Sequence, residues 1–434
     1  MEYIALLMFG LLILLLLTGY PVAFVLGAIS LLFGSIYLGF DFFQLLPFRI
    51  WGIMTSFTLL AVPLFVFMGV ILEKSGVAEE LLDTMGRVFG RIRGGLAISV
   101  VMVGALLAAT TGVVGASVVT MTVIALPSML KRGYAPSLAS GTIAASGTLG
   151  QIIPPSIILI LLGDVIGVPV GELFIGAVVP GIMLILAYIL YIVYVAWRHP
   201  HLAPAVRDDN PELAALWISV LKSLLPPLLL IIAVLGSIFY GIASPTESAA
   251  VGALGSLILA ALHRRLTLPN LRDAMEKTAR LTSMVFLIFI GATAFGLVFV
   301  GMGGDGLILD IFSGLPGGKW TFLVLSMLLI FILGFFLDFI EICFIVVPII
   351  APVAIHLNID PLWFALLIAI NLQTSFLTPP FGFSLFYLKA SAPPTLKLMD
   401  IYRGIMPFVG IQIIVLALLI SFPAISLWLP NLMG

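Results

Sequence analysis

Two stretches of the chain carry the same interruption of an apolar segment: SGTLGQIIPPS at residues 146–156 and NLQTSFLTPPFG at residues 371–382. Adjacent prolines remove two backbone donors and free carbonyl groups one turn earlier, so each stretch is expected to join two half-helices through an unwound loop. Unwound backbone is tolerated inside a membrane only where protein buries it or where it lines a cavity. The two loops therefore predict both the kind of fold and the place of its site.

The composition around these loops is that of a chain that lives in lipid. Of its 434 residues, 62% are hydrophobic and only 9% are charged, and the mean hydropathy is +1.29. These values exclude a soluble globular protein. Apolar segments long enough to cross a hydrocarbon core recur throughout and leave no room for a soluble domain. The first reads as a retained span rather than a signal peptide, because no basic leader precedes it. The expected spans are 4–18, 20–40, 55–74, 136–163, 170–197, 218–240, 243–264, 280–302, 361–390 and 401–428.

The 19 Lys and Arg residues set the orientation, because basic loops stay on the cytoplasmic side. One orientation places nearly all of them inside, and only Arg49 and Lys319 then fall outside. The side of the N-terminus stays open, because TGYPVAF at 18–24 either separates two spans or merely breaks one. The basic segments placed inside are 91–93, 131–132, 198–222, 264–280 and 389–403.

The two halves of the chain match each other at an offset of 221 to 225 residues. Five membrane crossings separate a segment from its counterpart, and an odd number inverts the second copy. Inverted repeats place a binding site near the midplane at the repeat interface and allow two states that open to opposite sides. The matching landmarks are Gly94 and Gly95 with Gly317 and Gly318, Gly112 with Gly334, Pro127 with Pro348, Pro136 with Pro361, and Pro154 and Pro155 with Pro379 and Pro380.

Two further apolar segments, 94–130 and 319–357, are too short for two full spans and a turn. Polar or helix-breaking residues stand at their middles, in ATTGVVGAS at 109–117 and LGFFLDFIE at 333–341. Each is expected to be a re-entrant hairpin, the first entering from the cytoplasm and the second from outside. The predicted fold class is an all-α polytopic membrane protein with inverted structural repeats, two re-entrant hairpins and two Pro-Pro-interrupted helices.

The unwound loops offer ligands of two kinds. Freed carbonyls and nearby hydroxyls are hard oxygen ligands that suit an alkali cation, and half-helix N-termini suit a carboxylate. This combination is what sodium-coupled uptake of an organic acid needs. A single proline kink that merely eases packing is a common alternative, but two loops at matching repeat positions favour a site. The hydroxyls belong to Ser146, Thr148, Ser156, Thr374, Ser375 and Thr378.

Acidic residues inside apolar segments need their own explanation. Asp338 and Glu341 stand in the second hairpin, where an ionised carboxylate is costly and usually paired or functional. A role near the cation or in hairpin closure is expected. The alternative is that both are wet near the outer surface or accept hydrogen bonds at a helix N-terminus. Glu247, in ASPTESAA at 243–250, is expected to cap a helix.

The remaining motifs argue against an enzyme. The single cysteine, Cys343, excludes a disulfide framework and a cysteine metal cluster, and the four histidines lack ligand spacing. No phosphate-binding Gly-Lys-Ser/Thr loop is present, so the chain does not use ATP directly. The basic segments 87–95 and 263–280 read as interfacial helices at the cytoplasmic headgroups, without a chemical role. No cofactor beyond a coupling ion and no nucleic-acid partner is expected.

Several motifs, in order along nearly the whole chain, resemble the large membrane subunit of the tripartite ATP-independent periplasmic (TRAP) transporters. They are AVPLFVFMGVILEKSG (61–76), GRIRGG (90–95), LPSMLKRGYAP (126–136), GTLGQIIPPS (147–156), TES (246–248) and LTPPFG (377–382). The resemblance implies a bacterial inner-membrane importer of the elevator type that carries mainly organic acids with sodium. It also implies two partners, a small four-helix membrane subunit, which must be supplied separately here, and a soluble periplasmic substrate-binding protein.

The resemblance also implies where ions and solute bind. Residues 111–117 and 146–155 would form one sodium site, residues 334–341 and 374–382 its repeat-related partner, with the solute, an organic acid or a polyol-like molecule, between them. Sodium ligands are expected at Ser146, Gly150, Gly334 and Thr378. One departure is Gly115-Ala116-Ser117, where the family often has glycine-serine-serine, which puts the hydroxyl count of the first site in doubt. The full candidate set is Thr111, Gly112, Gly115, Ser117, Ser146, Gly147, Thr148, Gly150, Pro154, Pro155, Ser156, Gly334, Asp338, Glu341, Asn371, Thr374, Ser375, Thr378, Pro379, Pro380 and Gly382.

These inferences divide the chain into a moving unit and a scaffold. A stand-alone ion-coupled carboxylate symporter that needs no binding protein is the alternative, because it would use the same moving unit; a channel would not need two hairpins that close from opposite sides. The expected scaffold is 1–93 with its interfacial arm, 166–317 with its cytoplasmic arm, and 391–434. The expected transport unit is 94–165 and 318–390, each a hairpin plus a broken helix.

Overall fold

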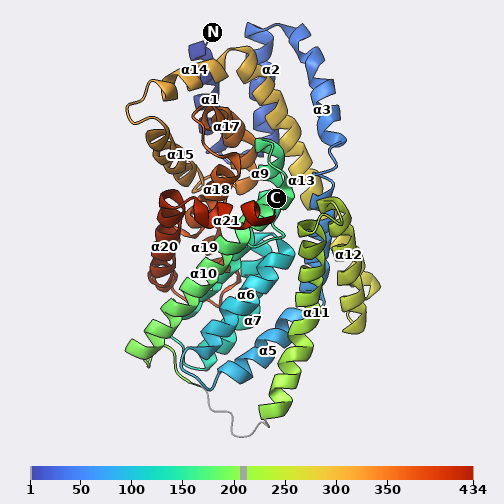
Figure 1. Cartoon of the computed structure of the whole chain (residues 1–434), viewed down its shortest axis with the longest axis vertical. Coiled ribbons are helices and arrows are strands. Elements are labelled where there is room, and N and C mark those ends of the chain that lie inside the picture. Colours follow the sequence, from blue (N-terminus) through green and yellow to red (C-terminus); the bar gives the residue numbers. More distant parts are fainter. Residues whose placement is uncertain (1, 206–212, 434) are drawn as a thin grey trace.

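The computed structural model describes residues 2–205 and 213–433, and the side chains of residues 213–218 are not described. Part of the predicted cytoplasmic segment 198–222 therefore lies outside the described residues. Within the described ranges every regular element is a helix, so the all-α fold class is confirmed. Figure 1 shows these helices in an elongated bundle with the N-terminus at one end.

The chain opens with short helices in place of one long span. Pro21, whose ring cannot continue a helix, precedes the second of them, and Gly19 in the break has a φ of 82°. The TGYPVAF stretch therefore separates two helices. The first four elements are α1 (Glu2–Leu16), α2 (Val22–Tyr37), η1 (Phe40–Leu45) and α3 (Leu46–Met54).

The predicted span 55–74 is shorter in the structure. The hydroxyl of Thr55 donates to the carbonyl of Trp51 at 2.8 Å and closes α3, so α4 (Ala61–Lys74) begins only after a turn. Gly76, with a φ of 78°, then turns the chain by 56° into α5 (Val77–Phe89).

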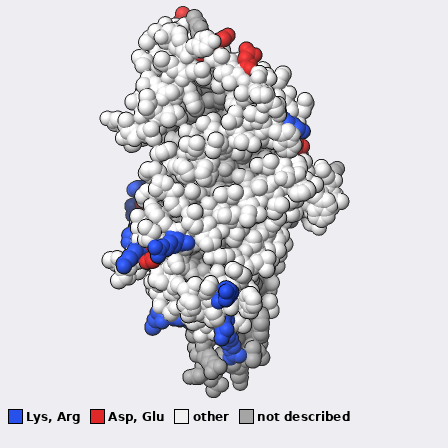
Figure 2. All heavy atoms as spheres, turned by 90° about the vertical axis from the view of Figure 1, so that its left-hand side faces the viewer, with Lys and Arg blue, Asp and Glu red and all other residues white. Residues whose placement is uncertain are grey.

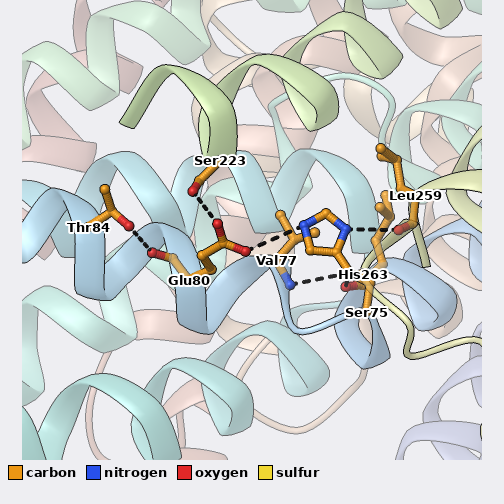
Figure 3. A network of polar contacts seen from close by, with 8 residues as sticks. Ser75, Val77, Glu80, Thr84, Ser223, Leu259 and His263 are labelled. Carbon is orange, nitrogen blue, oxygen red and sulfur yellow. Dashed lines mark hydrogen bonds and ion pairs between the residues drawn. The ribbon is translucent and has the colours of Figure 1, made fainter. Parts of the chain in front are cut away.

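A polar network fixes α5 to α11 (Leu213–Phe239) and α12 (Pro245–Leu262) (Figure 3). Glu80 Oε1 accepts a hydrogen bond of 2.6 Å from Ser223 on α11, and Glu80 Oε2 lies 3.4 Å from His263 Nε2 at the end of α12. His263 Nδ1 lies 2.8 Å from the carbonyl oxygen of Leu259. These contacts hold α5, α11 and α12 as one block. As expected, Glu247 completes a capping box with Ser244 at the start of α12.

Both predicted hairpins have the expected helix–break–helix form. The first consists of α6 (Gly95–Thr111) and α7 (Val114–Lys131), and Gly112 between them has a φ of 61°, which favours glycine. The second consists of α15 (Lys319–Leu333), then α16 (Phe339–Glu341), the π-turn η3 (Ile342–Val346) and α17 (Val347–His356). Figure 1 shows the first pair in the lower part of the bundle and the second in the upper part. Entry from opposite sides of the membrane, and the inversion of the repeat, stay predictions.

Both paired prolines interrupt a helix, as predicted. The first broken helix runs α8 (Pro136–Thr148), η2 (Leu149–Gln151) and α9 (Ile157–Ile166); the second runs α18 (Pro361–Leu377) and α19 (Phe383–Ser391). The Pro154-Pro155 and Pro379-Pro380 peptide bonds are both cis. The segments 152–156 and 378–382 are non-helical, and they are called loop 1 and loop 2 below.

Two further predicted boundaries are wrong. The basic segment 263–280 is not a separate interfacial helix: α13 (Leu268–Gly301) has 34 residues, starts at the N-cap Thr267 and continues without a break past Arg280, so it is about 51 Å long. The predicted span 401–428 is two helices, α20 (Leu398–Ser421) and α21 (Ala424–Met433), because Pro423 ends the first. The other elements are α10 (Val170–Arg198) and the short α14 (Gly304–Ser313).

Seven segments in the described ranges are long and apolar enough to cross a membrane. The length and composition of α7 and of the segment Phe339–His356 meet this test although each is the second arm of a hairpin. The bundle packs closely where α8 crosses α20: a Cβ on Gly141 would collide with the carbonyl of Gly404, and a Cβ on Gly404 with the carbonyl of Ser137. Two glycines therefore let these helices touch through their backbones.

Charge separates the two ends of the molecule. Figure 2 shows Lys and Arg gathered over the lower half and acidic residues at the upper end. By the positive-inside rule the lower end faces the cytoplasm. The N-terminus lies at the opposite end, because Glu2 packs against Gly303 at the start of α14. With this orientation the N-terminus is expected on the side opposite the cytoplasm.

Candidate functional site

The two hairpin tips face each other across a central cavity of about 110 Å³. Val113 and Gly115 line it from the first hairpin, Asp338 and Phe339 from the second, and Tyr387 from α19. Helices α4 and α13 also contribute to the wall. Segments far apart in the sequence thus meet at one place.

The tip of the first hairpin is held by its own hydroxyls. Thr111 Oγ1 and Ser117 Oγ lie 2.6 Å apart, and Ser117 also donates to the carbonyl of Val113 at 3.2 Å. A Cβ on Gly115 would lie 2.9 Å from the ring of Tyr387, so the absence of a side chain lets this aromatic ring close over the tip.

Loop 1 and the helix end that leads into it pack against the first hairpin. A Cβ on Gly150 would lie 2.8 Å from the carbonyl oxygen of Ala108, and one on Gly147 would collide with Val118. The hydroxyls donate to nearby carbonyls: Ser146 to Ile143 at 3.0 Å, Thr148 to Ala145 at 2.8 Å and Ser156 to Gln151 at 2.8 Å. A hydroxyl that donates its proton keeps its lone pairs, so these oxygens can still face a cation.

Loop 2 repeats the arrangement against the second hairpin. Gly334 packs directly on the hydroxyl of Ser375, and Asn371 Nδ2 donates to the carbonyl of Met327 on α15 at 2.6 Å. Gly382 N donates to the carbonyl of Thr378 at 3.1 Å, inside the loop. The remaining hydroxyls again donate along their own helix: Thr374 to Ile370 at 2.8 Å, Ser375 to Leu372 at 2.9 Å and Thr378 to Thr374 at 2.7 Å.

Asp338 and Glu341 form a capping box at the tip of the second hairpin. Asp338 Oδ1 accepts from the backbone N–H of Phe339 at 2.8 Å, and Glu341 Oε2 accepts from the N–H of Asp338 at 3.1 Å. The sequence left several roles open for these two acids. The structure shows one of them, the acceptance of hydrogen bonds at a helix N-terminus. Asp338 also lines the central cavity. A role beside a cation stays a prediction.

Sequence reasoning missed the contacts that join the two halves. Gln373 Nε2 lies 3.4 Å from Thr148 Oγ1, so the two broken helices touch at these residues. Gln412 on α20 donates to the hydroxyl of Tyr188 on α10 at 2.7 Å. Gln151 is fully buried beside loop 1, and neither of its side-chain polar atoms has a partner among the described residues. An offset of 225, the one that matches Pro154 with Pro379, also aligns Thr148 with Gln373, and this alignment is the sequence signal for their contact.

The comparison with known proteins decides the family. Residues 9–425 match the sequence profile described as "Tripartite ATP-independent periplasmic transporter, DctM component". The chain belongs to this family. It is a TRAP transporter large permease subunit for small organic solutes, in the inner membrane, and not an enzyme, which confirms what the motifs and composition predict.

Relatives of this TRAP permease match it over nearly its full length. The large permease protein DctM of a C4-dicarboxylate TRAP transporter from Pseudomonas aeruginosa is 33% identical over 395 residues, 91% of each chain. The C4-dicarboxylate TRAP permease of Rhodobacter capsulatus is 31% identical over 447 residues, 99% of each chain. The crystal structure of the Alcanivorax borkumensis YdaH transporter has a TM-score of 0.63 at 15% identity and covers 95% of this chain and 98% of that one. That likeness supports the fold alone.

Proposed function

We propose that this permease carries an organic acid or similar small solute into the cytoplasm, coupled to sodium, by an elevator motion. The convergence of both hairpin tips, each packed on its own broken helix, on one central cavity supports this proposal most directly. Repeat interfaces built from discontinuous helices are where secondary transporters bind solute and coupling ions. The names of the two C4-dicarboxylate relatives favour an organic acid as the solute.

Sodium is the proposed coupling ion because of the donors that the loops offer. Hydroxyls and backbone carbonyls are oxygen ligands without charge, and such ligands suit a hard cation. No group of three or more His, Cys, Asp or Glu that could hold a metal ion occurs in the described part of the chain, so a transition metal has no matching ligand set there. We place the two sodium sites at Ser146 and Gly150 beside the first hairpin and at Gly334 and Thr378 beside the second.

The proposed moving unit contains the hairpins, the broken helices, and also α10 and α20. Both added helices pack on the broken ones: Gly404 of α20 touches α8, and Trp363 Nε1 on α18 donates to the carbonyl of Leu419 at 2.9 Å. With this boundary, and apart from the local hydrogen bond from Thr321 to the carbonyl of Pro316 where the chain enters α15, only two side-chain hydrogen bonds in the described ranges join the unit to the rest. They are Ser56 to Asp164 at 3.2 Å and Thr120 to Glu73 at 3.1 Å. A boundary with so few polar contacts can slide at little cost.

The proposed partners are a separate small four-helix membrane subunit and a periplasmic binding protein. The tripartite description of the family supports both. A stand-alone carboxylate symporter is the second candidate, because the same cavity and loops would serve it without a binding protein.

Uptake into proteoliposomes that hold this permease with its small subunit tests the proposal. Solute is supplied either free or bound to the binding protein, under an inward sodium gradient or a matched potassium gradient. We expect uptake only with the sodium gradient and only from the loaded binding protein. Equal uptake with potassium would contradict sodium coupling, and equal uptake of free solute would favour the stand-alone symporter.

A further inference from the structure

A second, larger cleft adjoins the central cavity on the side of the basic, cytoplasmic end. This inner cleft has a volume of about 440 Å³. The two spaces share five lining residues, so the cleft lies directly beside the central cavity. The shared residues are Val66, Val113, Gly115, Leu281 and Tyr387.

Three charged side chains line the inner cleft: Glu73 on α4, and Lys277 and Arg280 on α13. Lys277 and Arg280 are three residues apart on one helix and therefore share a face. They reach the cleft because α13 continues as one helix through the basic segment. The central cavity holds no cation among its described lining residues, so these two side chains are the first cations that a solute meets on the way to the cytoplasm.

The two cations differ in how far they are already neutralised. Lys277 Nζ lies 3.5 Å from Asp273 Oδ2, which Lys74 also approaches at 2.5 Å. Arg280 has no ion pair or side-chain hydrogen bond to another described residue. Glu73, the one acid of the cleft wall, accepts a hydrogen bond from Thr120 at 3.1 Å. Arg280 is thus the cation whose field is least cancelled by its neighbours.

We propose that Arg280, assisted by Lys277, forms an anion-binding exit site that receives the carboxylate of the carried solute as it leaves the central cavity. A guanidinium presents a fork of donors that matches a carboxylate, and a cleft with low-dielectric walls concentrates the field of its charges. The inference rests on the proposed import of an organic acid. The chemistry that it requires is an anionic oxygen group, which a lipid phosphate would also supply.

The test measures the local potential and needs no knowledge of the solute. Val119, which lines the cleft on the hairpin side, is replaced by cysteine in a Cys343→Ala chain held with its small subunit in nanodiscs, where both membrane faces are accessible. The rate of modification is measured with an anionic and with a cationic methanethiosulfonate reagent. We expect Arg280→Gln to lower the anionic-to-cationic rate ratio by roughly five-fold, the size expected for removing one charge at short range, and Lys277→Gln to lower it less.

Arg272→Gln is the matched control, because Arg272 lies on the same helix, is 80% exposed and pairs with Glu276. It should leave the ratio unchanged. The proposal would be overturned if Arg280→Gln left the anionic-to-cationic rate ratio unchanged, or if Arg272→Gln lowered it equally. Either result would count even if sodium-driven uptake is observed.

A second arm separates the solute from the lipid as the source of the anion. In phosphatidylcholine nanodiscs, succinate serves as the carboxylate probe and should slow the anionic reagent in the parent but not in Arg280→Gln. Adding phosphatidylglycerol should leave that protection in place. The anionic lipid could instead remove both the faster reaction with the anionic reagent and the protection by succinate. In that case the site holds a lipid headgroup, and the proposal that it receives the solute fails.

Discussion

At the scale of single residues, Thr378 is the position where sodium dependence can be separated from folding. Thr378→Ala removes one of the proposed oxygen ligands from loop 2, so we expect the sodium concentration for half-maximal uptake to rise roughly ten-fold, equivalent to about 1.4 kcal/mol. Thr378→Ser should restore the parent value. Thr142→Ala is the control, since the Thr142 hydroxyl is buried in α8 and only donates to the carbonyl of Leu138 at 2.7 Å. An unchanged sodium response in Thr378→Ala would remove Thr378 from the site.

Asp338 tests whether the cap of the second hairpin also serves the cation. Asparagine caps helices as well as aspartate does, whereas alanine costs about 1 kcal/mol. Asp338→Asn should therefore keep the melting temperature of the parent and weaken sodium-dependent uptake, while Asp338→Ala should lower both. If Asp338→Asn keeps the full sodium response, the carboxylate acts only as a cap.

At the scale of elements, the crossing of α8 and α20 depends on backbone contact between glycines. Gly404→Ala would place a Cβ against the Ser137 carbonyl, and overpacking of this kind costs about 1–3 kcal/mol. Gly410→Ala on the same helix meets nothing within 4 Å and should be neutral or slightly stabilising, because alanine favours a helix. Thermal unfolding of the purified protein measures the difference. Equal melting temperatures of the two variants would mean that α20 and α8 are not in close backbone contact at Gly404.

The sequence predicted the breaks that single residues impose on their own backbone. Gly112 and the paired prolines act through backbone geometry, so the first hairpin break and both loops could be predicted. The length of α13 could not be predicted in this way. A basic, polar segment such as 268–280 is typical of a separate helix. The cap at Thr267 stands before this segment, and no cap or break separates the segment from the apolar part of α13. The position of Tyr387 over Gly115 and the contact of Gln373 with Thr148 depend on tertiary packing, which periodicity does not encode.

At the scale of the whole molecule, the proposed elevator motion is that of one unit sliding against a fixed block. The block is held together by the Glu80 network among α5, α11 and α12 (Figure 3). The unit is held together by the contacts of α8, α18 and α20. The charge difference between the two ends seen in Figure 2 indicates which end faces the cytoplasm.

The most direct test of this motion is a cross-link over the boundary. Ser56 and Asp164 already touch at 3.2 Å, so Ser56→Cys with Asp164→Cys, in a Cys343→Ala chain, should form a disulfide under oxidation. The control is Ser237→Cys with Ser248→Cys, whose hydroxyl oxygens lie 2.8 Å apart between α11 and α12 inside the fixed block. The account predicts that oxidation abolishes uptake in the first pair, that reduction restores it, and that the control pair transports in both states. Normal uptake by the fully cross-linked Ser56–Asp164 pair would contradict the elevator account.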